Sequence, residues 1–165
     1  MALEESQQRV YSIALVHEHL YGCDRLDRID FSRYARELAQ GVFSSFSGEH
    51  SRIGLDFELD PIEVGIERAV PCALILNELL SNAFKYAFAD GRAGRILVSF
   101  CQPEPEWFEM SVEDNGVGLP AGALGGQERS LGLRIVGILT SQLDGSLEQR
   151  ESPGTRIVLR FPAVA

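Results

Sequence analysis

A stretch in the middle of the chain carries three polar side chains that could serve metal and phosphate chemistry. Glu78, Asn82 and Lys85 are spaced four and three residues apart, so an α-helix would display them on one face. The amide oxygen of Asn82 is a suitable ligand for Mg²⁺, which takes few protein ligands beside water and phosphate oxygens. Lys85 would supply a point charge for phosphate. The same spacing is typical of an ordinary solvated helix face, so this segment alone leaves both interpretations open.

A carboxylate next to a glycine-rich turn is the second candidate. Asp114 follows the predicted strand 107–113, and Gly116 and Gly118 come shortly after it. A carboxylate at the end of a strand can accept a hydrogen bond from an exocyclic amine such as that of adenine. Glycines let the backbone approach a flat ring that side chains would block. The alternative is a plain turn, in which aspartate is a common turn former.

Two further segments could contact phosphate groups. A predicted helix begins at 130–133, and the free amide groups of a helix N-terminus bind phosphate. The glycine-rich stretch before it, at 116–126, could hinge over a ligand. Thr155 follows Gly154 in a predicted hairpin and could reach phosphate. Each segment also has a simpler explanation, a serine N-cap in the first case and a glycine turn in the second.

Hydrophobic periodicity indicates which elements must position these residues. We expect helices at 3–22, from Asp30 or Ser32 into the mid-40s, at 71–88 and at 131–143, and strands at 53–59, 95–101, 107–113, 146–150 and 156–161. On the 71–88 helix, apolar residues recur on the side that would pack on a sheet, at Leu76, Leu79, Leu80, Ala83 and Ala87. Adjacent antiparallel strands with helices on one face predict an α/β (α+β) sandwich around a mixed, mostly antiparallel sheet. The sequence has neither G-x-G-x-x-G after a strand nor G-x-x-x-x-G-K-[ST], which argues against a dinucleotide-binding unit and a P-loop.

The composition limits the classes of partner. With a formal net charge of −9, the chain lacks the positive field that nucleic acid or an anionic membrane needs, so no nucleic-acid partner is expected. The three cysteines lack the C-x-x-C spacing of zinc and redox sites, and reduced thiols fit a cytoplasmic protein. No apolar run approaches the roughly 20 residues that cross a bilayer, and the N-terminus does not resemble a signal peptide.

The four segments, in this order, resemble the N, G1, G2 and G3 boxes of the Bergerat-fold ATPases, a group shared by gyrase, heat-shock chaperones, mismatch-repair proteins and histidine kinases. The stretches 77–87 and 114–119 carry most of the resemblance, which covers about residues 52–161. A closer resemblance is to sensor histidine kinases with HisKA_2-type dimerisation helices, and it rests on residues 6–21 and the connector 29–31. The segment 107–109 is similar to the W-x-E element of the HWE kinases, but Asn77 stands where those carry histidine, so that subfamily is the second choice.

The resemblance implies a role for each site residue. Asn82 would ligate Mg²⁺, and Asp114 would hold the adenine amine. The other contacts would come from Gly116 and Gly118 along the base, Lys85 and Tyr86 beside the nucleotide, Ser130, Leu131, Gly132 and Leu133 at the phosphates, and Thr155 near the base or the phosphates. Leu119 would begin a short ATP lid at 119–130. Glu78, whose counterpart is a general base in ATP-hydrolysing relatives, would orient the attacking group or a metal-bound water. Residues 1–29 would form part of the dimerisation and phosphotransfer region, and residues 30–165 the catalytic domain.

The resemblance also implies a phosphate acceptor that this sequence does not contain. Histidine kinases transfer the γ-phosphoryl group of ATP to a histidine within an H-R-x-x-N run, and no such run is present. The histidines are His17, His19 and His50, and His17 falls where the second dimerisation helix belongs, so a packing role is favoured. The expected partners are therefore ATP with Mg²⁺, the acceptor-histidine helix of the intact kinase, a response regulator, and a second copy bound through residues 3–22. Two other functions stay open: a nucleotide-binding regulatory module without phosphoryl transfer, and a Ser/Thr protein kinase of the anti-sigma type.

Overall fold

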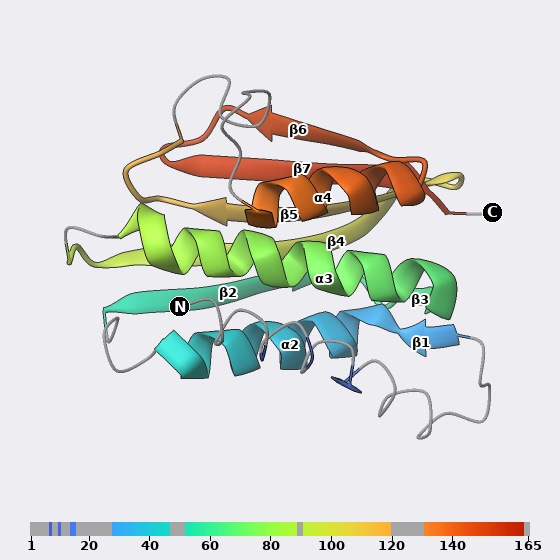
Figure 1. The fold of residues 1–165 in the computed structure, drawn as a ribbon, viewed down its shortest axis with the longest axis horizontal. Coiled ribbons are helices and arrows are strands. Elements are labelled where there is room, and N and C mark those ends of the chain that lie inside the picture. Colours follow the sequence, from blue (N-terminus) through green and yellow to red (C-terminus); the bar gives the residue numbers. More distant parts are fainter. Residues whose placement is uncertain are drawn as a thin grey trace.

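The chain folds as a sandwich of two layers. The computed structural model describes residues 28–46, 52–88, 91–119 and 131–163, together with Gln7, Val10, Ala14 and Leu15. Within these residues, three helices cover one face of a five-stranded sheet (Figure 1): α2 (Phe31–Phe46), α3 (Ile66–Asn82) and α4 (Leu131–Gln142). This arrangement confirms the predicted fold class. None of the helices in the described part of the chain is long and apolar enough to span a membrane.

The sheet has the strand order β2–β4–β5–β7–β6. Its strands are β2 (Ile53–Leu59), β4 (Gly94–Glu104), β5 (Trp107–Asp114), β6 (Ser146–Arg150) and β7 (Thr155–Pro162). The pair β2–β4 is parallel and the other pairs are antiparallel, so the sheet is mixed, as predicted. β4 continues past its expected end at residue 101 and through Pro103, where its pairing with β5 becomes irregular. Proline is tolerated at such a point because the irregular pairing does not use the missing N–H.

A second sheet consists of two short strands that the sequence does not predict, β1 (Arg28–Asp30) and β3 (Glu63–Gly65). Each strand has three residues, too few for an alternating pattern to stand out. The strands pair antiparallel, with Ile29 opposite Val64, and both of these side chains are buried. Because β1 leads directly into α2 and β3 into α3, this pairing fixes where the two helices begin.

Helix α2 (Phe31–Phe46) begins at one of the two predicted caps, Asp30. The Oδ1 atom of Asp30 accepts a hydrogen bond from the Arg33 backbone N–H at 3.1 Å and another from the Ser32 hydroxyl at 2.6 Å. These bonds satisfy an amide group that would otherwise have no partner in the first turn. Helix α2 then runs beside α3 over the sheet (Figure 1).

Replacing Asp30 by alanine should lower the free energy of unfolding by about 1 kcal/mol, the usual cost of losing an N-cap. Burial raises the pKa of Asp30, but hydrogen bonds from Ser32 and Arg33 and the charge of Arg33 outweigh it, so the pKa lies below its ordinary value. The stabilisation is therefore present above the unfolded-state pKa of about 3.9 and is lost as the pH falls through the folded-state pKa. Urea unfolding from about pH 7 to about pH 3 should show the two proteins converging. An equal difference at both ends of this range would contradict the cap.

Helix α3 (Ile66–Asn82) begins earlier than the sequence predicts. Proline is typical of a first helical turn, which favours a start near residue 71, but Pro71 lies inside the helix. Pro71 has no N–H to donate to the carbonyl of Glu67, so one intrahelical bond is missing. The turn before it still forms, because Ala69 and Cys72 are both buried and hold this part of the helix in the core.

The helix continues beyond Asn82 as a π-helical segment, η1 (Ala83–Ala87). This corrects the prediction of a regular α-helix through residue 88. A π-helix pairs residues five apart instead of four, which rotates the residues after Asn82 relative to a regular helix. Phe84 in this segment stacks on Phe46 at the end of α2, with ring centroids 5.3 Å apart. The predicted apolar stripe is buried throughout, at Leu76, Leu79, Leu80, Ala83 and Ala87.

Helix α4 (Leu131–Gln142) and the β6–β7 hairpin agree with the predictions for the C-terminal part of the chain. Gln7, Val10, Ala14 and Leu15 are helical, in agreement with the predicted helix 3–22 at these positions. The rest of the predicted helix 3–22, the lid segment at 120–130 and the three histidines lie outside the described residues. The predicted domain boundary after residue 29 likewise stays a prediction.

Candidate functional site

A cavity of about 350 Å³ lies between the sheet and the α3–η1 helix. Its lining residues come from α3 and η1 (Leu79, Asn82, Ala83, Tyr86, Ala87), from β5 and the turn after it (Val112, Asp114, Val117, Gly118, Leu119), and from α4 and β7 (Leu133, Thr155, Ile157). The volume falls within the range of small-molecule sites, about 300–1,000 Å³. The wall is mostly apolar, and Asp114 is the one charged side chain among the described lining residues. Such a cavity suits a flat, largely apolar group that presents a hydrogen-bond donor to the carboxylate.

Asp114 is held in place by its neighbours on the sheet. It ends β5 opposite Thr155, the first residue of β7. Its Oδ1 atom accepts the backbone N–H of Gly116 at 2.9 Å and that of Thr155 at 3.3 Å. Burial raises the pKa of Asp114 above its ordinary value, although hydrogen bonds from Gly116 and Thr155 act to lower it. A carboxylate has lone pairs beyond these bonds, so Asp114 can still accept a donor from a ligand.

Two glycines around Asp114 are required by close packing. A Cβ at Gly154 would lie 2.4 Å from the Asp114 carbonyl oxygen and 2.6 Å from its Oδ1 atom. A Cβ at Gly116 would lie 2.2 Å from the carbonyl oxygen of Ala87. Gly118 differs, because its φ of 81° is a conformation that favours glycine. The sequence interpretation includes Gly116 and Gly118 among the site residues but omits Gly154, whose one signal is its place directly before Thr155.

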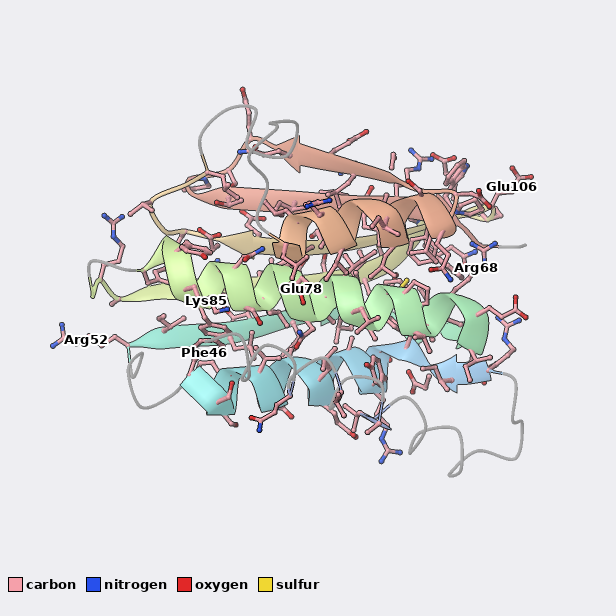
Figure 2. The ribbon with its side chains drawn as sticks, in the orientation of Figure 1. Phe46, Arg52, Arg68, Glu78, Lys85 and Glu106 are labelled. Atoms are coloured by element: carbon pink, nitrogen blue, oxygen red, sulfur yellow. The ribbon has the colours of Figure 1, made fainter. Side chains whose placement is uncertain are left out.

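The three polar residues predicted to share one helix face do not meet at the cavity. Asn82 lines it, whereas Glu78 and Lys85 are outside its lining. Glu78 lies about one turn before the end of α3, and Lys85 lies in η1 (Figure 2). The π-helical segment rotates Lys85 further from Asn82 than a regular helix would, whereas Tyr86, which is also a predicted site residue, lines the cavity. Glu78 is only 7% exposed, so it is not part of an ordinary solvated helix face.

The remaining predicted residues also divide into two groups. Four of them line the cavity: Gly118, Leu119, Leu133 and Thr155. Leu131 is 63% exposed and Gly132 is half-buried, and neither belongs to the lining, while Ser130 lies outside the described residues. The apolar walls Val112 and Ile157 are absent from the predicted site. In a sequence, such residues within strands cannot be distinguished from ordinary core residues.

A metal ion at this cavity would have few protein ligands. The described residues contain no group of three or more His, Cys, Asp and Glu side chains that could hold a metal. Asn82 contributes an amide side chain to the lining. Mg²⁺ tolerates so sparse a protein ligand set when water and phosphate oxygens complete its coordination.

Comparison with known proteins gives two family matches. The family "Histidine kinase-, DNA gyrase B-, and HSP90-like ATPase" (HATPase_c) matches residues 67–165, and the HisKA_2 histidine kinase family matches residues 1–46. The sensor histidine kinase PdtaS of Mycobacterium tuberculosis is 32% identical over 164 residues, which make up 98% of this chain and 32% of that protein. The nitrate/nitrite sensor protein NarX of Escherichia coli is 31% identical over 111 residues, 66% of this chain and 17% of that protein. The chain therefore spans a third or less of the length of these curated relatives.

A solved structure supports the same fold. The histidine kinase domain of the blue-light activated histidine kinase EL346 from Erythrobacter litoralis matches with a TM-score of 0.86 at 24% sequence identity. The match covers 96% of this chain and 75% of that one. At this level of identity the likeness establishes the architecture and not the chemistry.

Proposed function

Because the chain belongs to the family of histidine kinase-, DNA gyrase B- and HSP90-like ATPases and carries a HisKA_2 segment, we propose that it is the Mg²⁺–ATP-binding catalytic domain of a sensor histidine kinase. It would transfer the γ-phosphoryl group of ATP to a histidine elsewhere in the intact kinase. The observation that carries the proposal is that Asn82 and Asp114, which are far apart in sequence, line one cavity of nucleotide-binding size.

The base end of the proposed site is formed by Asp114 and the apolar walls. The carboxylate accepts a hydrogen bond from the exocyclic amine of adenine. The N–H groups of Gly116 and Thr155 keep the carboxylate oriented. Val112 and Ile157 provide the apolar contact for the ring. Gly154 and Gly116 allow the close packing that holds Asp114 in place, and the mostly apolar lining around that carboxylate fits a purine.

The phosphate end is formed by Asn82 and the N-terminus of α4. The amide oxygen of Asn82 serves as the protein ligand for Mg²⁺, which would neutralise charge on the phosphate oxygens. Leu133 lies in the first turn of α4 and lines the cavity, which supports a phosphate contact through the amide groups of Leu131 and Gly132. Together with Ser130 they would cap the phosphates. Lys85 and Tyr86 flank the nucleotide, with Tyr86 at the cavity itself.

Glu78 would orient the attacking group. It is a buried carboxylate four residues before Asn82, which lines the cavity, so the two residues lie on the same side of the helix one turn apart. A carboxylate in this position can hold a water molecule or the acceptor imidazole by a hydrogen bond.

The phosphoryl acceptor and the other partners would come from the intact kinase. The sequence has no H-R-x-x-N run, so the acceptor is a histidine outside these 165 residues, and a response regulator receives the phosphate from it. Residues 1–29 would belong to the dimerisation and phosphotransfer region, pairing two copies through residues 3–22, with the catalytic domain at 30–165. The domain would work in the cytoplasm, where ATP is available.

Asn82→Ala should remove the part of ATP affinity that depends on Mg²⁺. The variant has no amide oxygen for the ion, so its affinity for a nonhydrolysable ATP analogue with Mg²⁺ should fall by about ten-fold or more, toward the value without Mg²⁺. Titration calorimetry with and without Mg²⁺ measures this. Gln142→Ala, which removes an exposed amide side chain on α4, is the matched control and should bind like the wild type. If Asn82→Ala and the wild type bind the ATP analogue with Mg²⁺ equally well, Asn82 is not a ligand of the metal.

Phosphoryl transfer needs a separate test. The chain should label an intact kinase that carries the acceptor histidine but has its own ATP site inactivated, when γ-labelled ATP is supplied. Tight ATP binding without any labelling would favour the regulatory module instead. Label on serine or threonine, which unlike phosphohistidine survives acid treatment, would favour the anti-sigma type of kinase.

A further inference from the structure

The turn that follows Asp114 is fixed to two other segments of the chain. On one side, the Val117 N–H donates to the carbonyl oxygen of Ala87, the last residue of η1, at 3.0 Å. On the other side, Asn115 makes two hydrogen bonds with Arg95 near the start of β4. Its N–H donates to the Arg95 carbonyl oxygen at 3.3 Å, and its Oδ1 atom accepts the Arg95 N–H at 2.8 Å. The position of the turn depends on both attachments.

The Asn115 side chain takes over where the backbone pairing of β4 and β5 stops. The last paired residues at this end are Ile96 and Asp114, and the chain then leaves the sheet. The Asn115 Oδ1 atom supplies the acceptor that the carbonyl of a further strand residue would have supplied. Gly94 leaves room for it, since a Cβ there would lie 2.7 Å from this Oδ1 atom. The bond from Arg95 therefore needs both the length of asparagine and the missing side chain of glycine.

Asn115 is outside the 350 Å³ cavity. It is exposed and borders a second hollow of about 250 Å³ together with Arg95 and Leu97, and Asp114 lines both hollows. Its effect on a ligand must therefore pass through its neighbours. Gly116, directly after it, donates its N–H to the Asp114 Oδ1 atom, so a displaced turn would change the direction of the carboxylate.

We propose that Asn115 is a positioning residue that sets the preference for adenine by fixing the turn that orients Asp114. The inference rests on the proposed function, in which Asp114 accepts the adenine amine. Without the side-chain bond, the turn is attached to Arg95 and Ala87 by one backbone bond each. Because a hydrogen bond depends steeply on direction, a less fixed carboxylate distinguishes less well between an amine and an oxygen. A residue with a purely structural role would change stability without changing the ratio of ATP to GTP affinity.

Three variants of the whole chain test this assignment. Asn115→Ala removes the acceptor, Asn115→Asp keeps an oxygen in the same place, and Gln102→Ala is the matched control. Gln102 also makes one exposed side chain–backbone bond, to the Pro105 carbonyl oxygen at 2.7 Å, but at the far end of the same two strands. The measurements are the affinities for nonhydrolysable ATP and GTP analogues, the melting temperature, and the hydrogen exchange rate of the Arg95 amide without nucleotide.

In Asn115→Ala the hydrogen of the Arg95 amide should exchange faster than in the wild type. The variant should bind ATP about three- to ten-fold more weakly and lose most of the preference for ATP over GTP. Asn115→Asp should keep most of that preference, and Gln102→Ala should match the wild type. Equal ATP and GTP affinities in Asn115→Ala and wild type, or an unchanged Arg95 exchange rate, would overturn the inference while leaving the proposed function intact. A wild-type chain that does not bind ATP would overturn both.

Discussion

Asp114→Asn should weaken ATP binding by about ten-fold or more and reduce the preference for ATP over GTP. The Oδ1 atom of Asp114 accepts the N–H groups of Gly116 and Thr155, so asparagine would keep its oxygen there and turn its amide N–H groups to the cavity. These N–H groups and the adenine amine are both hydrogen-bond donors, so no hydrogen bond can form between them. Leaving a buried donor without an acceptor costs about 1–3 kcal/mol of binding free energy. Guanine carries an acceptor at the same position. Titration calorimetry with both nucleotides measures the effect, and an unchanged ATP-to-GTP ratio in the variant would contradict the assigned role.

The same substitution should raise the melting temperature of the nucleotide-free protein. Burial raises the pKa of Asp114 by more than hydrogen bonds from Gly116 and Thr155 lower it. The stabilisation from the neutral form is therefore present below the unfolded-state pKa of about 3.9 and is lost as the pH rises through the folded-state pKa. At neutral pH the ionised carboxylate destabilises the fold, and the neutral amide removes that cost. Thermal unfolding from about pH 7 to about pH 4 should show the advantage of the variant shrinking. A variant that melts below the wild type at neutral pH would contradict this account.

Gly154→Ala should abolish measurable ATP binding and lower the melting temperature. The new methyl group would lie 2.4 Å from the Asp114 carbonyl oxygen, 2.6 Å from its Oδ1 atom and 2.6 Å from the Gly116 nitrogen. These atoms belong to the backbone or to a carboxylate held by two N–H groups, so none can move without the others. Overpacking costs about 1–3 kcal/mol or more. At this chain length each kcal/mol lowers the melting temperature by about 2–4 °C. Differential scanning calorimetry and nucleotide titration measure the two effects.

Gly54→Ala is the matched control for that variant. Gly54 lies on β2, and the nearest atom to a Cβ there is the Gly94 carbonyl oxygen at 3.9 Å, an ordinary contact. We expect its melting temperature and ATP affinity to equal those of the wild type or to rise slightly, since alanine is less flexible than glycine in the unfolded chain. If Gly154→Ala behaves like Gly54→Ala, the close packing beneath Asp114 has no role in binding.

The fold could be predicted from the sequence wherever one long pattern dominated. The alternation in β2 and the apolar stripe from Leu76 to Ala87 both extend over enough residues to identify the element. The failures came from features too short or too irregular for a pattern. β1 and β3 have three residues each, and Pro71 indicates a helix start although tertiary packing continues the helix before it. Periodicity also assumes α-helical geometry, and so it could not reveal the π-helical segment.

The site was predictable for Asn82, Asp114 and the residues of the glycine-rich segments, and not for the wall residues within the strands. Asn82 and Asp114 were identified from side-chain chemistry and adjacent glycines, and both line the cavity. Lys85 and Tyr86 were both assigned to the nucleotide, and Tyr86 lines the cavity while Lys85 lies outside its lining. Asn115 was missed as a contributor because its function depends on a bond to Arg95, twenty residues away, that no local pattern signals.

The segment η1 bears on how relatives should be aligned with this chain. Five-residue hydrogen-bond spacing accommodates one more residue per turn than an α-helix, so the segment is equivalent to an insertion inside a helix. In a homologue without that insertion, a gap belongs between the counterparts of Asn82 and Phe88. An ungapped alignment would equate Tyr86 with a residue at a different angle around the helix axis, and evolutionary comparison would then pair positions that are not equivalent in space.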